Sequence, residues 1–278
     1  MASYSATRWW SKWEIFKQLL LQFGDIEPFL NRNTDLGPSS RPRLLAILSD
    51  QEKLKHLKLE LAAVIDWGEV FVKATYNLEG DGPLSFTAYE EVRTVAEAVR
   101  VAHTPNTEAV IRSMSSQSSV QQRHRSYARN CMQPALDYFK GLLDSSLKEN
   151  ISIFKAVRIF NPQKVAMLKP DVSHVNALQI IPFFKNEELE KLKAELPSYL
   201  AKADDISDDL DPLEWWKLNT SVLPHWSNAV KKVLAIQPSS AAAERVFSLL
   251  NSGFSDLQEN SLKDYIAIEA SIMLRYNQ

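Results

Sequence analysis

The feature that most constrains this chain is a series of apolar residues that recur mostly at three- and four-residue spacing between residues 54 and 72. Such spacing places apolar side chains on one face of an α-helix, because a helix completes a turn in about 3.6 residues. The stripe consists of Leu54, Leu57, Leu61, Val64 and Val72. We therefore expect a long amphipathic helix that ends at the turn-forming residues 79–83.

Two further stretches repeat the helical spacing. One contains Phe86, Tyr89, Val92, Val95, Ala96 and Val99, and the other runs from about residue 107 to residue 147 with a serine-rich interruption at 113–119. The chain has only seven glycines, and its periodic stretches do not show the two-residue alternation of strands. The sequence therefore predicts a mainly α fold, in which the last stretch divides into two helices at its interruption.

An acidic segment marks the predicted domain boundary. Residues 204–211 hold five aspartates, whose mutual repulsion opposes packing in a helix. We interpret the segment as a solvated linker between a helical region at 1–203 and a C-terminal region at 212–278. In the C-terminal region we expect helices over 212–235 and 239–278, separated by Gln237 and Pro238.

Charge and composition exclude several functions. The net charge of −2 provides no global positive field, so any contact with DNA has to come from a local patch. Cys131 is the only cysteine, which excludes an internal disulfide and a multi-cysteine zinc site, and the five histidines lack a paired ligand spacing. No apolar run approaches the roughly 20 residues of a membrane span, and the first ten residues contain no readable secretory signal. We expect an intracellular protein without a metal site.

Several motifs near the C-terminus carry a resemblance to a known family. In chain order they are residues 211–217, Leu223 with Pro224, residues 233–236, and residues 239–248 with Glu244, Arg245 and Phe247 at their centre. Together they resemble the C-terminal dimerisation region of hAT transposases. Separate motifs at compatible spacing are a more specific signal than any one of them alone.

Two upstream segments extend the resemblance. Thr7-Arg8-Trp9 looks like the tripeptide that precedes the helical insertion of the family, and residues 156–164 look like a later family segment. The chain departs from the family pattern at residues 10–11, 251–253 and 258–260. The resemblance implies a helical insertion region followed by the C-terminal helices of a ribonuclease-H-like transposase core, with most of the core sheet missing. It also implies a nuclear location.

By this resemblance, Glu244 matches the third acid of a catalytic centre that cuts DNA with two divalent metals. A pair of Mg²⁺ or Mn²⁺ ions needs several converging carboxylates, and the family carries its other two acids upstream of the Thr-Arg-Trp. We therefore expect Glu244 to be vestigial and the chain to use no cofactor unless a complete centre is assembled. Asp25, Asp66 and Glu69 are expected to be solvated or paired acids on helix surfaces. Ser239 or Ser240 is expected to cap the helix that carries Glu244.

Apolar residues of the C-terminal region are the predicted dimerisation contacts. Large aromatic and aliphatic side chains on broad helical faces serve equally as a core or as an interface. The predicted contacts are Trp215, Trp216, Val246, Phe247, Leu250, Leu262, Ile266 and Met273. Core packing is the alternative for at least one of the two tryptophans.

A basic cluster is the best candidate for DNA contact. It consists of Arg112, Arg123, His124, Arg125 and Arg129, with Tyr127 among them. Arginine meets phosphates and tyrosine stacks on bases, although a solvated helix face is the alternative interpretation. Near the start of the chain, Trp9, Trp10 and Trp13 are interpreted as packing anchors rather than base contacts.

Three functions follow from these residues. The first is a noncatalytic, transposase-derived protein that forms a homodimer or associates with related hAT proteins. The second is a transposase remnant that contributes Glu244 to a nuclease centre completed by another chain. The third is a DNA-binding module that uses the basic cluster. No membrane partner is expected.

Overall fold

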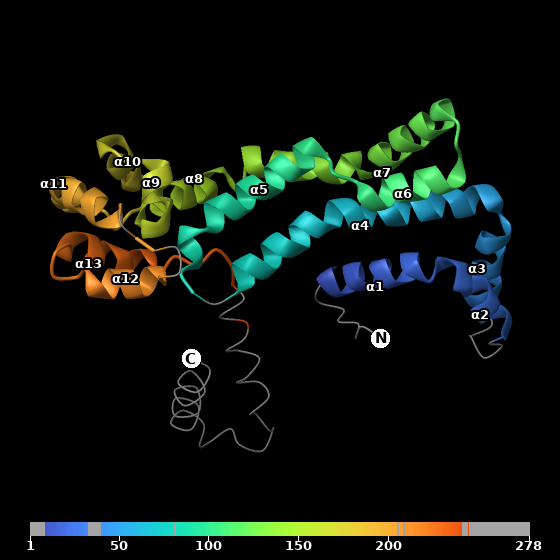
Figure 1. Cartoon of the computed structure of the whole chain (residues 1–278), viewed down its shortest axis with the longest axis horizontal. Coiled ribbons are helices and arrows are strands. Elements are labelled where there is room, and N and C mark those ends of the chain that lie inside the picture. The colour runs from blue at the N-terminus through green and yellow to red at the C-terminus, as the bar shows by residue number, and fades with distance from the viewer. Residues whose placement is uncertain are drawn as a thin grey trace, which may run out of the picture. The chain divides into compact units, whose positions relative to one another are not determined.

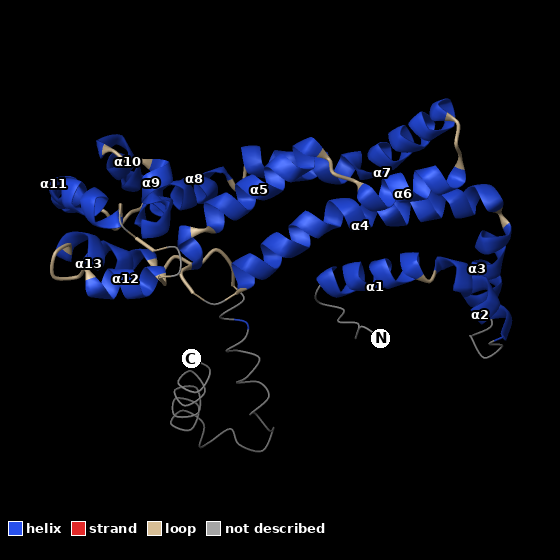
Figure 2. Cartoon of the chain, viewed as in Figure 1, coloured by secondary structure: helices blue, strands red, loops and turns tan. Residues whose placement is uncertain are grey.

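The chain folds into helices and loops (Figure 2). The computed structural model describes residues 9–32, 40–80, 82–204, 206–207, 210–240 and 244, and these residues contain no strand. The mainly α prediction is confirmed for them. None of the helices in this part of the chain has both the length and the apolar character needed to cross a membrane.

The chain divides into two compact units. Unit 1 consists of Met1–Tyr76 and Tyr89–Ala156, and unit 2 consists of Asn77–Ala88 and Val157–Gln278. Unit 1 holds α1 (Trp9–Leu21), η1 (Phe23–Asp25), α2 (Ile26–Arg32), α3 (Ser40–Ser49), most of α4 (Gln51–Glu79), α5 (Ala88–Val101), α6 (Pro105–Met114), α7 (Ser118–Asp144) and most of α8 (Lys148–Val157).

Helix α4 is the centre of unit 1 and runs between α1 and α6 in Figure 1. It packs against α1 and η1, α6 and α7 through three core clusters, in which Leu61, Leu59 and Trp67 are buried. The predicted end of the helix at residue 79 is confirmed. The predicted stripe is too narrow, because a helix surrounded by several neighbours buries more than one face. One residue of the stripe, Leu57, is not buried and remains 39% exposed.

Helix α1 is attached to α4 by a tryptophan. Trp13 is buried, and its indole Nε1 donates a hydrogen bond of 2.9 Å to the carbonyl oxygen of Ile65. The ammonium group of Lys17 lies 4.3 Å from the centre of the same ring. Trp13 is therefore a packing anchor, as predicted, while the side chains of Trp9 and Trp10 lie outside the described residues.

The third predicted stretch forms two helices. Helix α6 ends at Met114 and α7 begins at Ser118, within the serine-rich interruption at 113–119. The two helices pack side by side and are joined by Arg125, whose Nε and Nη2 donate to the Glu108 carboxylate at 2.7 and 2.8 Å. The division into two helices is confirmed.

Asp66 of α4 caps the start of α6. Its Oδ1 accepts hydrogen bonds from the backbone and side-chain nitrogens of Asn106, and its Oδ2 accepts from the backbone nitrogen and hydroxyl of Thr107, at 2.7–3.1 Å. The first N–H groups of a helix lack partners within the helix, so a carboxylate there satisfies them and favours the positive end of the helix dipole. The expectation that Asp66 is a surface acid is wrong: only 5% of the residue is exposed.

Unit 2 holds the remaining helices. They are η2 (Leu84–Phe86), η3 (Arg158–Phe160), η4 (Pro162–Lys164), α9 (Val165–Leu168), α10 (Val172–Ala177), η5 (Leu178–Ile180), α11 (Asn186–Ala203), α12 (Pro212–Leu218) and α13 (Pro224–Val233). The helix expected over 212–235 is two helices, since Pro224 begins a new one.

The acidic segment 204–211 joins elements of the same unit. Helix α11 precedes the segment, α13 follows it, and the two helices pack against each other within unit 2. The predicted boundary at 204–211 therefore does not coincide with the division between the compact units.

The Asp66 cap makes a testable contribution to stability. Asp66→Ala removes the carboxylate oxygens that accept from Asn106 and Thr107 and is expected to lower the free energy of unfolding of unit 1 by about 3 kcal/mol. Urea unfolding followed by circular dichroism measures the loss. Asp25→Ala, at an exposed aspartate, is the control and should change stability by no more than about 0.5 kcal/mol. Equal losses in the two variants would contradict the capping role.

Candidate functional site

The geometry of α12 follows directly from residues 211–217. The Asp211 carboxylate accepts a hydrogen bond of 3.0 Å from the backbone nitrogen of Leu213. Pro212 occupies the first turn, where a backbone N–H would have no partner within the helix, so its missing N–H costs no hydrogen bond. This start orients Trp215 and Trp216 inward, where they are 4% and 3% exposed. Both tryptophans therefore belong to the core of the protomer in this structure.

An aromatic core joins α11, α12 and α13. Tyr199 of α11 lies at its centre, with its ring centroid 4.4 Å from that of Trp226, 5.1 Å from that of Trp216 and 5.8 Å from that of Trp215. Phe160 packs against Trp226 at 5.2 Å. Aromatic rings of this size bury large apolar areas, so this core supplies much of the packing between the three helices.

Three of the buried rings donate hydrogen bonds to backbone carbonyls. Tyr199 donates to Ile159 at 2.8 Å, Trp216 to Phe160 at 2.9 Å and Trp226 to Leu192 at 3.0 Å. Burial raises the pKa of Tyr199 well above its ordinary value, so the phenol stays protonated and remains a donor. The polar atoms of these rings are thereby buried with partners, as a stable core requires.

Two segments that carry the family resemblance meet in this core. The carbonyl oxygens of Ile159 and Phe160 come from the upstream segment 156–164, and they accept from residues of α11 and α12. Gln163 of the same segment donates to the carbonyl oxygen of Leu210 at 3.0 Å. Segment 156–164 therefore holds α11 and α12 in place through backbone and side-chain hydrogen bonds.

The start of α13 is capped by a residue of α11. The Glu195 carboxylate accepts hydrogen bonds from the backbone nitrogens of His225, at 3.1 and 3.3 Å, and of Trp226, at 3.2 Å. Leu223, the residue before Pro224, is fully buried and has no capping side chain of its own. Glu195 thus fixes where α13 begins relative to α11.

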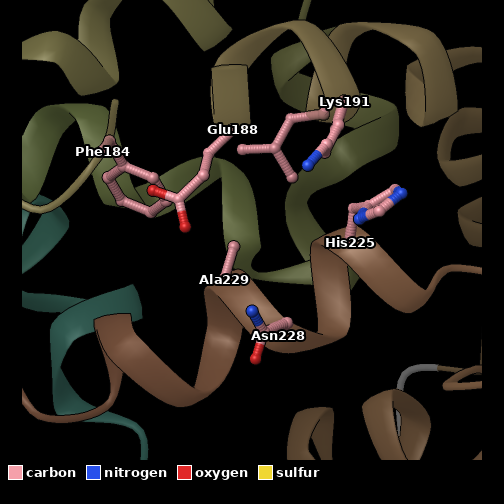
Figure 3. A pocket seen from close by; sticks show the side chains of 7 residues that line it. Phe184, Glu188, Lys191, His225, Asn228 and Ala229 are labelled. Carbon is pink, nitrogen blue, oxygen red and sulfur yellow. The ribbon is translucent and has the colours of Figure 1, made fainter. Parts of the chain in front are cut away.

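The other end of α13 is held by an ion pair, beside which lies a small hollow. The ammonium group of Lys232 pairs with the Glu188 carboxylate of α11, and this pairing lowers the pKa of Glu188. The hollow has a volume of about 90 Å³ and an apolar floor of Phe184, Leu192 and Ala229. Figure 3 shows that Glu188 and Lys191 project from one wall and that His225 and Asn228 project from the other.

Glu244 is the one described member of the predicted catalytic and C-terminal contact set beyond α13. It is exposed, its backbone nitrogen donates to the carbonyl oxygen of Ser240 at 2.9 Å, and its carboxylate accepts from the Ser240 hydroxyl. Ser239 donates instead to the carbonyl oxygen of Leu78 at 2.9 Å. The predicted contacts that lie outside the described residues are Val246, Phe247, Leu250, Leu262, Ile266 and Met273.

The structure does not bring the four arginines of the basic cluster onto one face. Arg125 pairs with Glu108, and this pairing lowers the pKa of Glu108 and raises that of Arg125. Arg123 and Arg129 are exposed but lie roughly 120° apart around α7, given about 100° per residue. Arg112 is exposed on α6. Tyr127 is half-buried and donates to Glu60, so its ring is packed against α4 rather than presented for stacking on a base.

The remaining candidate acids have structural surroundings. Asp25 is exposed, Glu69 forms an ion pair of 2.7 Å with Lys73, and Asp66 caps α6. Among the described residues, no three His, Cys, Asp or Glu side chains gather into a group that could hold a metal ion.

Sequence reasoning missed Tyr199, Trp226 and Glu195. The two aromatic residues carried a weak signal, because each lies among apolar residues at helical spacing. Glu195 carried none, since its role depends on the packing of α11 against the start of a helix that lies 30 residues later.

Comparison with known protein families gives a match in the C-terminal part of the chain. Residues 188–273 match the sequence profile described as the hAT family C-terminal dimerisation region. No curated protein and no solved structure matches the chain.

Removal of the Tyr199 hydroxyl tests the buried hydrogen bond. Tyr199→Phe leaves the Ile159 carbonyl without its donor and is expected to lower the free energy of unfolding of unit 2 by about 1–2 kcal/mol. Urea unfolding followed by tryptophan fluorescence reports on this unit through Trp215, Trp216 and Trp226. The same substitution at Tyr138, which is 71% exposed, should have almost no effect. A Tyr199→Phe variant as stable as the Tyr138→Phe variant would contradict the role.

The Glu188–Lys232 pair predicts a pH dependence. The folded pKa of Glu188 is lowered, so the pair stabilises the fold above the unfolded pKa of about 4.3 and the gain disappears as pH falls through the lower, folded value. Both side chains are about a third exposed, so Glu188→Gln should cost only about 0.5–1 kcal/mol at neutral pH.

Stability curves at pH 7 and at pH 3 measure this dependence. The difference in free energy of unfolding between the wild type and the Glu188→Gln variant should be smaller at pH 3 than at pH 7. Glu190→Gln, at a side chain that is 71% exposed, is the matched control and should show a small difference at both. A Glu188→Gln loss that stays constant with pH would contradict the ion pair.

Proposed function

Because this chain carries an hAT C-terminal dimerisation region, we propose that it is a transposase-derived protein that associates with itself or with related hAT proteins and does not cut DNA. The observation that supports the proposal is the matched region itself. It begins at Glu188 in α11, the helix that packs against α13 and contributes Tyr199 to the aromatic core. Helices α11, α12 and α13 form a packed core in which the buried tyrosine and tryptophan rings donate to backbone carbonyls, so they provide a rigid platform for a partner.

The noncatalytic part of the proposal is supported by the surroundings of the acids. The Glu244 carboxylate is exposed and accepts a hydrogen bond from Ser240 of the preceding turn, and Asp66 and Glu69 are committed to a helix cap and an ion pair. A two-metal centre needs carboxylates that converge on a shared site. In our proposal, the C-terminal helices descend from a ribonuclease-H-like core, Glu244 is a vestige of its centre, and the protein acts in the nucleus.

A second candidate function is supported by exposed basic residues. Arg112, Arg123 and Arg129 are exposed and are free to meet phosphates, although they are spread over two helices. In this alternative, the chain is a transposase remnant that binds DNA. It either acts as a DNA-binding module or contributes Glu244 to a nuclease centre that another chain completes with Mg²⁺ or Mn²⁺.

Mass and nuclease measurements on the purified full chain separate these functions. Light scattering should give a molar mass near twice the 31.6 kDa of one chain, and supercoiled DNA should stay intact in Mn²⁺. A monomer at the highest soluble concentration would contradict self-association. Nicking that Glu244→Gln abolishes would overturn the noncatalytic proposal and support the alternative.

A further inference from the structure

The outer side of the contact between α11 and α13 forms a continuous surface. The two helices run antiparallel, because Glu195 caps the start of α13 while Glu188 pairs with Lys232 at its end. On α11, residues 188, 191, 195, 198 and 202 recur at three and four positions and therefore share one side. On the other helix and the turn before it, Val222, His225 and Asn228 recur at the same spacing. We call this side the seam surface.

Two hollows open along the seam surface. The first is the hollow of about 90 Å³ lined by Lys191, His225 and Asn228, shown in Figure 3. The second is wider, about 550 Å³, and is lined by Ser198, Ala201, Lys202 and Val222. Small side chains at Ser198 and Ala201 keep it open. The seam surface therefore combines recesses and apolar patches with a polar rim, which is the composition of many non-obligate protein interfaces.

The turn between α12 and α13, which supplies Val222 to the wider hollow, presents two apolar side chains. Leu218 is 67% exposed and Val222 is 48% exposed. The turn is fixed from beneath, because the Asn219 amide donates to the carbonyl oxygen of Trp215 at 2.9 Å and the Thr220 hydroxyl donates to that of Trp216 at 2.8 Å. A turn already held in one conformation loses little entropy when a partner binds it.

We propose that the seam surface, together with Leu218 on the turn that carries Val222, is the docking surface for a second copy of this chain. The inference rests on the proposed dimerisation and assigns it to particular residues. The surface lies inside the segment that matches a dimerisation region, residues 188–273, which argues for a copy of the chain as the occupant. The buried tryptophans act indirectly, as positioning residues that hold the turn.

The area of the seam surface is about half of what one partner buries in a stable protein interface. Fourteen residues of rise along α11, at about 1.5 Å each, give a length of roughly 21 Å. Across two helix widths this is about 400 Å², half of the roughly 800 Å² that each partner buries in a standard interface.

Leu218→Asp and Val222→Asp test the docking surface in the full chain. Each places a charge on an exposed apolar residue of the proposed contact and is expected to raise the dimer dissociation constant roughly tenfold or more. The matched control is Met167→Asp, since Met167 is 64% exposed in the same unit but lies outside the matched segment. Sedimentation equilibrium measures the constants, and tryptophan fluorescence confirms that each variant is folded.

The outcomes separate this inference from the proposed function. A wild-type dimer weakened by Leu218→Asp and Val222→Asp but not by Met167→Asp supports the seam surface. A wild-type dimer that both variants leave intact overturns the seam surface while the proposed dimerisation stands. Equal weakening by all three variants also overturns it, because the effect is then not local. A monomeric wild type overturns both proposals.

Discussion

Burial of a phenol and two indoles without loss of their hydrogen bonds is the constraint on which unit 2 depends. Tyr199, Trp216 and Trp226 each donate to a backbone carbonyl, and two of these carbonyls belong to η3, far upstream in the sequence. A buried polar atom without a partner costs roughly 1–3 kcal/mol, so the three helices can pack closely only where these acceptors are available. This explains why segment 156–164 and the helices α11, α12 and α13 form one structure.

In both units, a carboxylate from a neighbouring helix caps the start of another helix. Asp66 of α4 caps α6 in unit 1, and Glu195 of α11 caps α13 in unit 2. In each case the capped helix begins with a proline and its own preceding residue makes no side-chain cap. The start of the helix is therefore defined by tertiary contact. In unit 2 this fixes α13 along α11, which creates the seam surface and its hollows.

Local sequence signals predicted much of the helical structure, and tertiary contacts explain the differences. The end of α4 at Glu79 and the break between α6 and α7 follow from turn-forming and serine-rich residues nearby. The burial of Asp66 and the cap by Glu195 depend on residues about 30 to 41 positions away, which periodicity does not reveal. Tertiary contacts were equally invisible at the candidate site. The family motifs identified the dimerisation region. They did not show that Trp215 and Trp216 are buried in the protomer's own core, nor that Leu218 and Val222 are exposed.

Self-association through the surface of the α11–α13 core is tested most directly by hydrogen–deuterium exchange of the full chain at low and high protein concentration. Amide protection reports local opening, so residues covered by a partner exchange more slowly when the partner is bound. Protection is expected to increase with concentration in peptides that span the turn between Leu218 and Pro224 and the exposed side of α11. An increase confined to α6 and α7, or none anywhere, would contradict it.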